Sequence, residues 1–174
     1  MQIPVYCINF RSLSLRITIN TILHLLYHIP TKENMELQFK KLSEHAQLPK
    51  YAHDGDSGMD VYATDSKTIP PYSFIKMPLN LACNIPTGYE LQVRPRSGLA
   101  AKHGVVCVFG TVDMGYRGDI GVTLFNHSNQ DVRIEKGDRV AQLVLAPVIR
   151  AEIVETDTLD DTDRGTNGFG STGR

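Results

Sequence analysis

The chain has 174 residues, of which 41% are hydrophobic, enough for a single domain with a buried core. Its 18 basic and 19 acidic residues leave a formal charge of -1, so no bulk positive field draws it to nucleic acid, and any phosphate recognition must be local. The three cysteines, Cys7, Cys83 and Cys107, have neither metal-ligand spacing nor the even number of a disulfide framework, which indicates a reducing, intracellular setting.

Residues 1–34 differ in character from the rest of the chain. They carry no acidic residue before Glu33, and Arg16, Asn20 and His24 interrupt their apolar run too often for a membrane span. An Arg-bearing, acid-poor stretch also fits an organellar transit peptide. We interpret residues 1–34 as an N-terminal extension outside the fold, and we expect a cytoplasmic protein with no membrane partner.

From Met35 onward, short runs rich in Val, Ile, Leu, Tyr and Phe alternate with turn residues such as the Pro70-Pro71 pair. Alternation is clear in residues 89–94, so one face of that strand is expected to be buried. Many short strands at this spacing predict an all-β sandwich or barrel, with a single helix near residues 98–103. We expect strands at residues 36–41, 59–63, 73–81, 89–94, 105–109, 120–126, 132–134, 140–147 and 151–155.

In residues 94–104 a strand runs into a tight turn and then into the short helix. Arg96, the Ser97 hydroxyl and the N–H groups after Gly98 would converge at the start of the helix, which predicts an anion site. A serine nucleophile is the competing interpretation, because His103 and Asp119 are also present. The flanking Pro-Arg-Ser-Gly sequence is not a nucleophile elbow, however, and no spacing supports a triad.

Residues 110–121 form a glycine-punctuated turn between two apolar runs and predict a hairpin. The hairpin carries a lone carboxylate, Asp113, and an aromatic ring, Tyr116, three residues later. Taken without its surroundings, Asp113 is better explained as a turn-forming residue, and the alternative for Tyr116 is an ordinary cross-strand aromatic.

The C-terminal residues change composition twice. Residues 157–163 contain four acids among Thr and Leu and predict a linker. Residues 164–174 hold four glycines together with Arg164, suited to phosphate, and Phe169, which offers a flat face for a base. A disordered terminal tail is the alternative interpretation of this segment.

The sequence resembles the homotrimeric dUTPase family, the dUTP diphosphatases, through five blocks that stand in the family's order. The resemblance covers residues 35–174. The blocks are Ser-Gly-Met-Asp-Val-Tyr-Ala (57–63), Arg-Pro-Arg-Ser-Gly-Leu-Ala (94–100), Gly-Thr-Val-Asp-Met-Gly-Tyr-Arg-Gly-Asp (110–119), Gly-Asp-Arg-Val-Ala-Gln-Leu (137–143) and the tail (164–174).

The resemblance implies a distorted jelly roll, a homotrimer, and a domain at residues 35–156 followed by a linker and arm at 157–174 that closes the active site. It implies hydrolysis of dUTP to dUMP and pyrophosphate with Mg²⁺ held mainly by phosphate oxygens and water, without protein ligands. The reaction would supply dUMP for dTMP synthesis and limit uracil incorporation into DNA. No nucleic-acid partner is implied.

The resemblance also assigns roles to residues of this chain. Asp113 would orient and deprotonate the attacking water, and Arg164 would neutralise phosphate charge. Asp60 and Arg139 would form a buried pair behind the site, with a surface salt bridge as the alternative. The substrate would be bound by Arg96, Ser97, Gly98, Gly110, Thr111, Val112, Asp113, Tyr116, Gly121, Gln142, Phe169, Gly170, Ser171 and Thr172.

Two positions depart from the family's frequent pattern. Cys107 stands where many members have an asparagine, which leaves open a side-chain contact to the uracil edge, and Gly115 stands where many have a second aspartate. The alternatives in function are an enzyme similar to dCTP deaminase and a non-catalytic interaction protein of the same fold. Incubation with dUTP, dCTP, UTP and dTTP separates all three.

Overall fold

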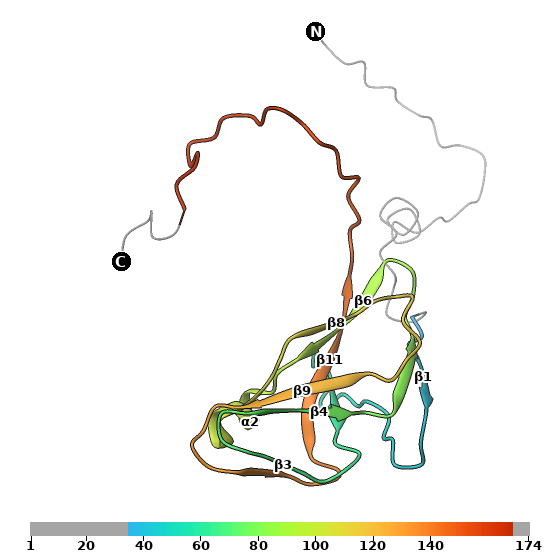
Figure 1. The fold of residues 1–174 in the computed structure, drawn as a ribbon. Coiled ribbons are helices and arrows are strands. Elements are labelled where there is room, and N and C mark those ends of the chain that lie inside the picture. Colours follow the sequence, from blue (N-terminus) through green and yellow to red (C-terminus); the bar gives the residue numbers. More distant parts are fainter. Residues whose placement is uncertain (1–34, 169–174) are drawn as a thin grey trace, which may run out of the picture.

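A computed structural model describes residues 35–168, and Figure 1 shows short strands with one short helix, confirming the all-β prediction. Each element is brief because turn residues follow closely on each apolar run. The elements are β1 (Gln38–Lys41), β2 (Met59–Tyr62), β3 (Lys67–Ile69), β4 (Phe74–Pro78), β5 (Leu81–Asn84), β6 (Tyr89–Arg94), α2 (Ser97–His103), β7 (Val105–Cys107), β8 (Gly110–Val112), β9 (Gly121–Asn126), β10 (Val132–Ile134) and β11 (Arg139–Pro147).

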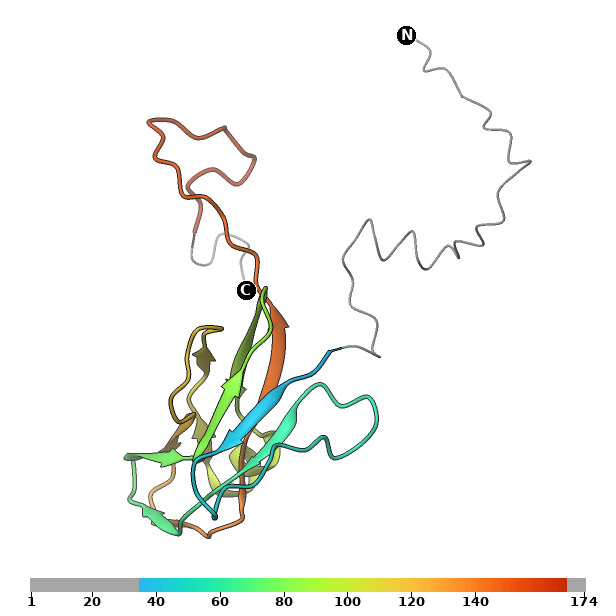
Figure 2. The ribbon, with the colours of Figure 1, turned by 90° about the vertical axis from the view of Figure 1, so that its right-hand side faces the viewer.

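The strands form small antiparallel sheets that wrap around one core. The four-stranded sheet has the order β2-β11-β6-β8 and the three-stranded sheet the order β4-β9-β7, while β1 pairs with β5 and β10 pairs with β3. In Figures 1 and 2, β11 runs beside β6. Strand β11 therefore connects β2, which carries Asp60, to β6, which leads to α2.

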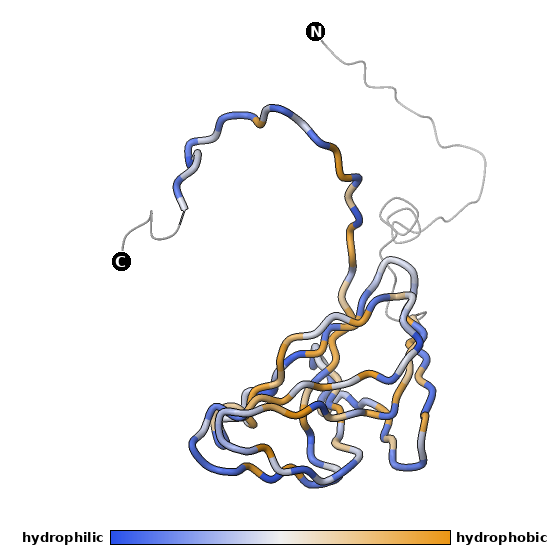
Figure 3. The backbone as a smooth tube through the Cα atoms, viewed as in Figure 1, coloured by the Kyte–Doolittle hydropathy of each residue, from blue (hydrophilic) through white to orange (hydrophobic). Residues whose placement is uncertain are grey.

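The core takes alternate residues from both larger sheets. Leu91 and Val93 of β6 are buried, and Tyr89 packs against the core from a partly buried position, as the alternation predicts. Leu143 of β11 and Leu124 of β9 are fully buried as well. Figure 3 shows hydrophobic residues along the strands that cross the domain and hydrophilic residues on many of the connecting loops.

Three strand predictions need correction. The predicted strand at 73–81 is two strands, because Asn80 adopts a φ of 52° and ends the run after β4. Strand β3 was missed, since it is short and mostly polar. The strand predicted at 151–155 does not form, because this segment has no partner strand within the described chain and Ile153 is 96% exposed.

The two apolar runs that flank the predicted hairpin do pair with each other, but the segment between them contributes a strand to a different sheet. Strands β7 and β9 pair with each other, whereas β8, which lies between them in sequence, pairs with β6. The chain thus crosses from one sheet to the other before residues 113–120 and returns afterwards. No helix among residues 35–168 is long and apolar enough to cross a membrane.

Candidate active site

A polar cavity of about 350 Å³ collects the predicted phosphate-binding residues. Strand β2, the turn before α2, the first turn of α2 and strand β11 supply its walls. Residues separated by most of the domain in sequence therefore meet at one place, as expected. The predicted residues that line it are Asp60, Arg96, Ser97, Gly98, Arg139 and Gln142.

Asp60 holds two arginines at the cavity wall. Its Oδ1 accepts a hydrogen bond from Arg96 Nε at 2.8 Å, and its Oδ2 accepts one from Arg139 Nη1 at 3.2 Å. The Asp60 side chain is 13% exposed and that of Arg139 is 51% exposed. The expected buried pair is therefore buried on the Asp60 side and exposed to solvent on the Arg139 side. Arg96 is the closer partner and also donates to the Arg139 carbonyl at 3.2 Å, which fixes the direction of its guanidinium.

Asp60 itself lies on a strand that has neighbours on both sides. It pairs with Gln142 of β11, and on its other side its amide donates to the Lys50 carbonyl at 2.8 Å while its carbonyl accepts from the Lys50 amide at 3.2 Å. A carboxylate on a strand held at both edges is a rigid base for two arginine side chains.

Helix α2 begins in the cavity without a side-chain cap. Its N-cap residue is Arg96, in an extended conformation with φ -100° and ψ 125°, and no side chain there bonds the first N–H groups. Ser97 is the first helical residue rather than the capping residue, and the first turn contains no acidic side chain. The N–H groups of this turn are therefore available to an anion beside Arg96.

Gln142 reaches the same cavity from β11. Its Nε2 donates to the Pro95 carbonyl at 2.9 Å, which ties the strand to the turn before α2. Gly58 leaves the room that this side chain needs, because a Cβ at position 58 would overlap the Gln142 amide group. Gly58 of the first sequence block therefore provides the space that the Gln142 side chain of the fourth block occupies.

The hairpin at residues 110–121 displays the predicted nucleoside-binding residues. Asp113 is exposed, and its carbonyl accepts a hydrogen bond from the Tyr116 amide at 3.0 Å, which closes a turn. Tyr116 is 47% exposed, and its hydroxyl donates to the Asp119 carbonyl at 3.0 Å. A Cβ on Gly118 would lie 2.6 Å from the Tyr116 ring carbon Cζ, so this glycine permits the ring to fold over the backbone.

The other predicted residues of the hairpin lie on its two strands. Gly110 and Thr111 of β8 pair with Val93 and Gln92 of β6. Val112 is buried in the core, so its side chain is structural and only its backbone can face a ligand. Gly121 opens β9, opposite Pro78 of β4.

A single chain does not bring the two halves of the predicted site together. The cavity with Arg96 has no residue of the hairpin in its lining, and Asp113 lines a different cavity of about 340 Å³ beside Glu90 and Arg150. Arg164 lies in the exposed C-terminal segment, where its Nε donates to the Asn167 carbonyl at 3.1 Å. The predicted residues Phe169, Gly170, Ser171 and Thr172 lie outside the described residues, as does the N-terminal extension.

Cys107 does not face the hairpin mouth. It is buried among core residues on β7 beside Leu124 of β9, and its thiol donates to the Val108 carbonyl at 3.2 Å. Burial raises the pKa of the Cys107 thiol to about 11. Cys107 is therefore a core residue, and its side chain is not placed to make the uracil contact that the resemblance had left open.

Sequence reasoning missed residues that fasten the hairpin to the domain. The Arg117 guanidinium donates to the carbonyls of Met114 and Tyr116, and Asp119 Oδ1 accepts from the Leu81 amide at 3.1 Å. Both residues stand inside the third sequence block, but only the fold shows which strand they reach. His53 and Asp56 on the wall of the phosphate-binding cavity were also missed.

Comparison with known proteins agrees with the sequence blocks. The dUTPase family model matches residues 44–173. A deoxyuridine 5'-triphosphate nucleotidohydrolase from Gloeothece citriformis is 49% identical over 141 residues, 80% of this chain and 97% of that protein. The chain belongs to the dUTPase family. A nucleotidohydrolase of the same name from Clostridium tetani is 44% identical over 140 residues, 79% of this chain and 97% of that protein.

Solved dUTPase structures share the fold. A mutant of the Staphylococcus bacteriophage 80alpha dUTPase with dUpNHpp has a TM-score of 0.76 and 28% identity, covering 81% of this chain and 100% of that one. A mutant of the phage phi11 dUTPase, described with a structural Mg(II) ion, has a TM-score of 0.69 and 25% identity, covering 73% of this chain and 100% of that one. These likenesses confirm the expected dUTPase-like architecture.

The described residues offer no group of three His, Cys, Asp or Glu side chains that could hold a metal ion. Asp60 is already occupied by Arg96 and Arg139. An ion that arrives on the phosphates of a nucleotide still fits the polar cavity, because such an ion needs few or no protein ligands.

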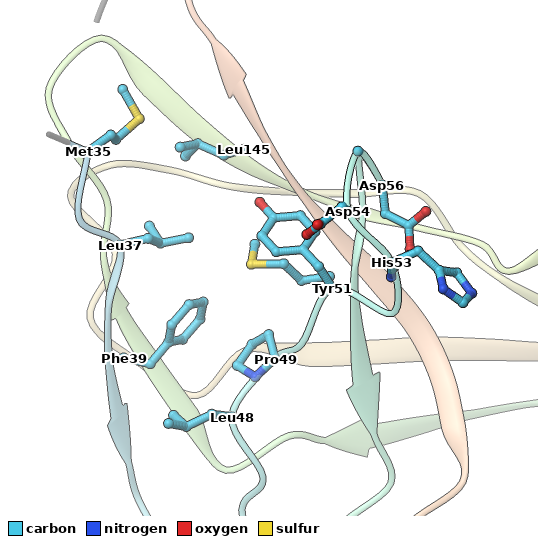
Figure 4. A pocket seen from close by; sticks show the side chains of 12 residues that line it. Met35, Leu37, Phe39, Leu48, Pro49, Tyr51, His53, Asp54, Asp56 and Leu145 are labelled. Atoms are coloured by element: carbon cyan, nitrogen blue, oxygen red, sulfur yellow. Dashed lines mark hydrogen bonds between the residues drawn. The ribbon is translucent and has the colours of Figure 1, made fainter. Parts of the chain in front are cut away.

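A third cavity, which is apolar, adjoins the phosphate-binding cavity. It has a volume of about 730 Å³, and Figure 4 shows Leu37 and Phe39 on the β1 side facing Pro49 and Leu145 across an open gap. His53 and Asp56 line both cavities. The apolar cavity holds no residue of the predicted site.

Proposed function

We propose that this protein hydrolyses dUTP to dUMP and pyrophosphate. The observation that carries the proposal is the polar cavity in which Arg96, Ser97, Gly98 and Gln142 meet at an uncapped helix start, in a chain of the dUTPase family. Fixed arginines and free N–H groups stabilise phosphate charge without reorganisation at the moment of reaction. Asp60 supports this cavity through Arg96 and Arg139.

Asp113 acts as the general base in this proposal. Its carboxylate accepts a proton from a water molecule whose oxygen forms a bond to the α-phosphorus, while the bond from that phosphorus to the bridging oxygen of the pyrophosphate breaks. The exposed position of Asp113 at a hydrogen-bonded turn supports the role, because the backbone that carries the carboxylate is held by the turn while the side chain is open to solvent.

Recognition of the nucleoside falls to the rest of the hairpin. Tyr116 lies against the deoxyribose and leaves no room for a 2'-hydroxyl, while the backbone of residues 110–112 and of Gly121 pairs with the uracil edge. The contact between Tyr116 and Gly118 supports this role, since it holds the ring against the hairpin.

The C-terminal arm completes the site. Arg164 neutralises phosphate charge in the transition state, Phe169 stacks on uracil, and Gly170, Ser171 and Thr172 bind the substrate. Mg²⁺ enters with the triphosphate and, when bound, offsets the charge of the adjacent phosphates. The arm is expected to order only on such a ligand.

We further propose that the active assembly is a homotrimer whose sites are shared between chains. Three features support it: the phosphate-binding cavity and Asp113 lie apart in one chain, the segment after β11 leaves the rest of the domain in Figure 1, and this segment exposes Ile149 at 97% and Ile153 at 96%. Burial against another chain would contribute about 1.5–3 kcal/mol for each isoleucine. The open apolar cavity of Figure 4 is a second surface that assembly could cover.

The reaction would supply dUMP for dTMP synthesis and keep uracil out of DNA, in the cytoplasm. The test is incubation of the purified protein and Mg²⁺ with dUTP, dCTP, UTP or dTTP and identification of the products. We expect dUMP and pyrophosphate from dUTP and little turnover of the others. Deamination of dCTP, or no turnover of any nucleotide, would contradict the proposal in favour of a deaminase or an interaction protein.

A further inference from the structure

One arginine outside the proposed substrate contacts fastens the hairpin tip. Arg117 Nη1 donates to the Met114 carbonyl at 2.6 Å and to the Tyr116 carbonyl at 2.9 Å, while Nη2 donates to Asn84 Oδ1 at 2.8 Å. One planar group therefore joins two carbonyls of the tip to the end of strand β5.

The connection continues into the domain. Asn84 Nδ2 donates to Gln38 Oε1 at 3.1 Å, and these two residues face each other in the pairing of β1 with β5. The guanidinium therefore docks on a side chain that is itself fixed by a partner strand.

Between β8 and β9 the tip has few other attachments. Between β8, which ends at Val112, and β9, which begins at Gly121, Ile120 is held at the base of the hairpin by backbone bonds to Leu79 and Leu81. Residues 113–118 have no backbone bond to a segment outside the hairpin within the described chain. The Asp119 carboxylate fastens only the base of the hairpin, at Leu81, and the turn bond from Tyr116 to Asp113 lies within the tip itself. The orientation of the tip relative to the domain thus depends on Arg117.

We propose that Arg117 is a positioning residue that sets the placement of Asp113 and Tyr116 through a link to Asn84. This inference rests on the proposed dUTP hydrolysis, since it gives those two residues their roles. Displacement of Asp113 would lower turnover, and displacement of Tyr116 would weaken discrimination against a ribose. A small displacement of a reacting group costs about tenfold to a hundredfold in rate.

The experiment compares Arg117→Ala and Arg117→Lys with the wild type in kcat/KM for dUTP and for UTP. We expect Arg117→Ala to lose about tenfold or more on dUTP and to lower the dUTP-to-UTP ratio by a similar factor. Arg117→Lys keeps the charge but loses the planar fork, and we expect only partial recovery. Arg133→Ala is the matched control, because this exposed arginine pairs with Glu135 and lies on β10, which pairs with β3 and not with a strand of the hairpin, so its ratio should stay unchanged.

A merely structural role gives a different result. Loss of folded protein would lower activity on dUTP and UTP by the same factor, so an unchanged ratio overturns the positioning role. If Arg117→Ala fails to fold, Asn84→Ala decides, because it removes the anchor and leaves the bonds from Arg117 to the tip. A wild-type ratio in folded Asn84→Ala contradicts the proposal.

Amide hydrogen exchange tests the link without any activity and so separates this inference from the proposed function. In Arg117→Ala, peptides covering residues 113–118 should exchange several-fold faster, while peptides of β6 and β11 exchange as in the wild type. Unchanged exchange in the tip overturns the link even if the wild type hydrolyses dUTP. Faster exchange with no wild-type turnover leaves the link intact and refutes the hydrolase.

Discussion

At the scale of single residues, the two carboxylates of the site have opposite surroundings. Asp60 is largely covered and fully engaged by arginines, so it is suited to holding charge in place rather than to exchanging protons. Asp113 is exposed on a turn and is ion-paired to no residue of the described chain. This contrast supports the proposal that Asp113, and not Asp60, acts as the general base.

Asp113→Asn removes the proton acceptor and keeps the shape of the side chain. We expect a folded protein that still binds dUTP and turns it over at least about a hundredfold more slowly, the scale of a lost general base. Steady-state kinetics and calorimetric binding of a non-hydrolysable analogue measure the two effects. Turnover near that of the wild type would take Asp113 out of this role.

The two buried thiols, Cys83 and Cys107, give a second prediction. Burial raises the pKa of each to about 11 from the model-compound value of 9.0, with Arg117 partly offsetting the shift at Cys83. The unfolded chain loses these protons first, so stability should fall as pH rises from about 9 to about 11. Urea unfolding at several pH values measures the slope, and Cys107→Ala should reduce it. A slope unaffected by that substitution would contradict the assignment.

At the scale of elements, glycine positions connect sequence blocks that look independent. The Gly of the first block provides space for the Gln of the fourth because β2 and β11 pair side by side. The resemblance implied that Gln142 binds the substrate. The contact with Gly58 could not be predicted, because it depends on the register of two strands distant in sequence.

Gly58→Ala tests this contact. The added methyl group should displace Gln142 and break its bond to the Pro95 carbonyl, so we expect KM for dUTP to rise about threefold to tenfold, as for one lost hydrogen bond. Kinetic assays measure the change. Gly55→Ala is a control for the loss of a glycine on the same loop, because a Cβ at this position meets no atom within 4 Å. Gly55 has a φ of 88°, so this variant also shows the effect of backbone strain alone. If Gly58→Ala changed KM no more than Gly55→Ala, steric contact with Gln142 would not be the cause.

The sequence predicted the fold class and most strands because alternation and turn residues are local signals. It failed at residues 151–155, where an apolar run with strand character has no partner strand in the described chain, and at β3, whose polar residues carry no such signal. The phosphate-binding residues could be predicted because a helix start is local. The attachment of the hairpin through Arg117 and Asn84 could not, since it needs the pairing of β5 with the rest of the domain.

At the scale of the whole molecule, the described residues of the proposed site lie in separate places in one chain. The cavity with Arg96, the cavity with Asp113 and the arm with Arg164 are separate places. The proposed homotrimer would resolve this separation, because chains that share sites bring the parts together.

Mixed assemblies test the sharing. Asp113→Asn chains and chains lacking residues 164–174 should each be almost inactive alone, and mixing them under conditions of subunit exchange should restore part of the activity. Mass spectrometry of the assemblies establishes that exchange has occurred. Confirmed exchange without recovered activity would refute the shared site. Each variant taken alone through the same exchange procedure is the matched control and should stay inactive.

The exposed segment after β11 also affects how the protein matures after synthesis. In the proposed homotrimer, a newly folded domain would expose Ile149, Ile153 and Leu159 to water until another copy binds and buries these side chains. The last step of maturation is then a collision between chains, whose rate rises with their number in the cell. Scarce expression would thus prolong the interval in which chaperones or proteases can reach the arm.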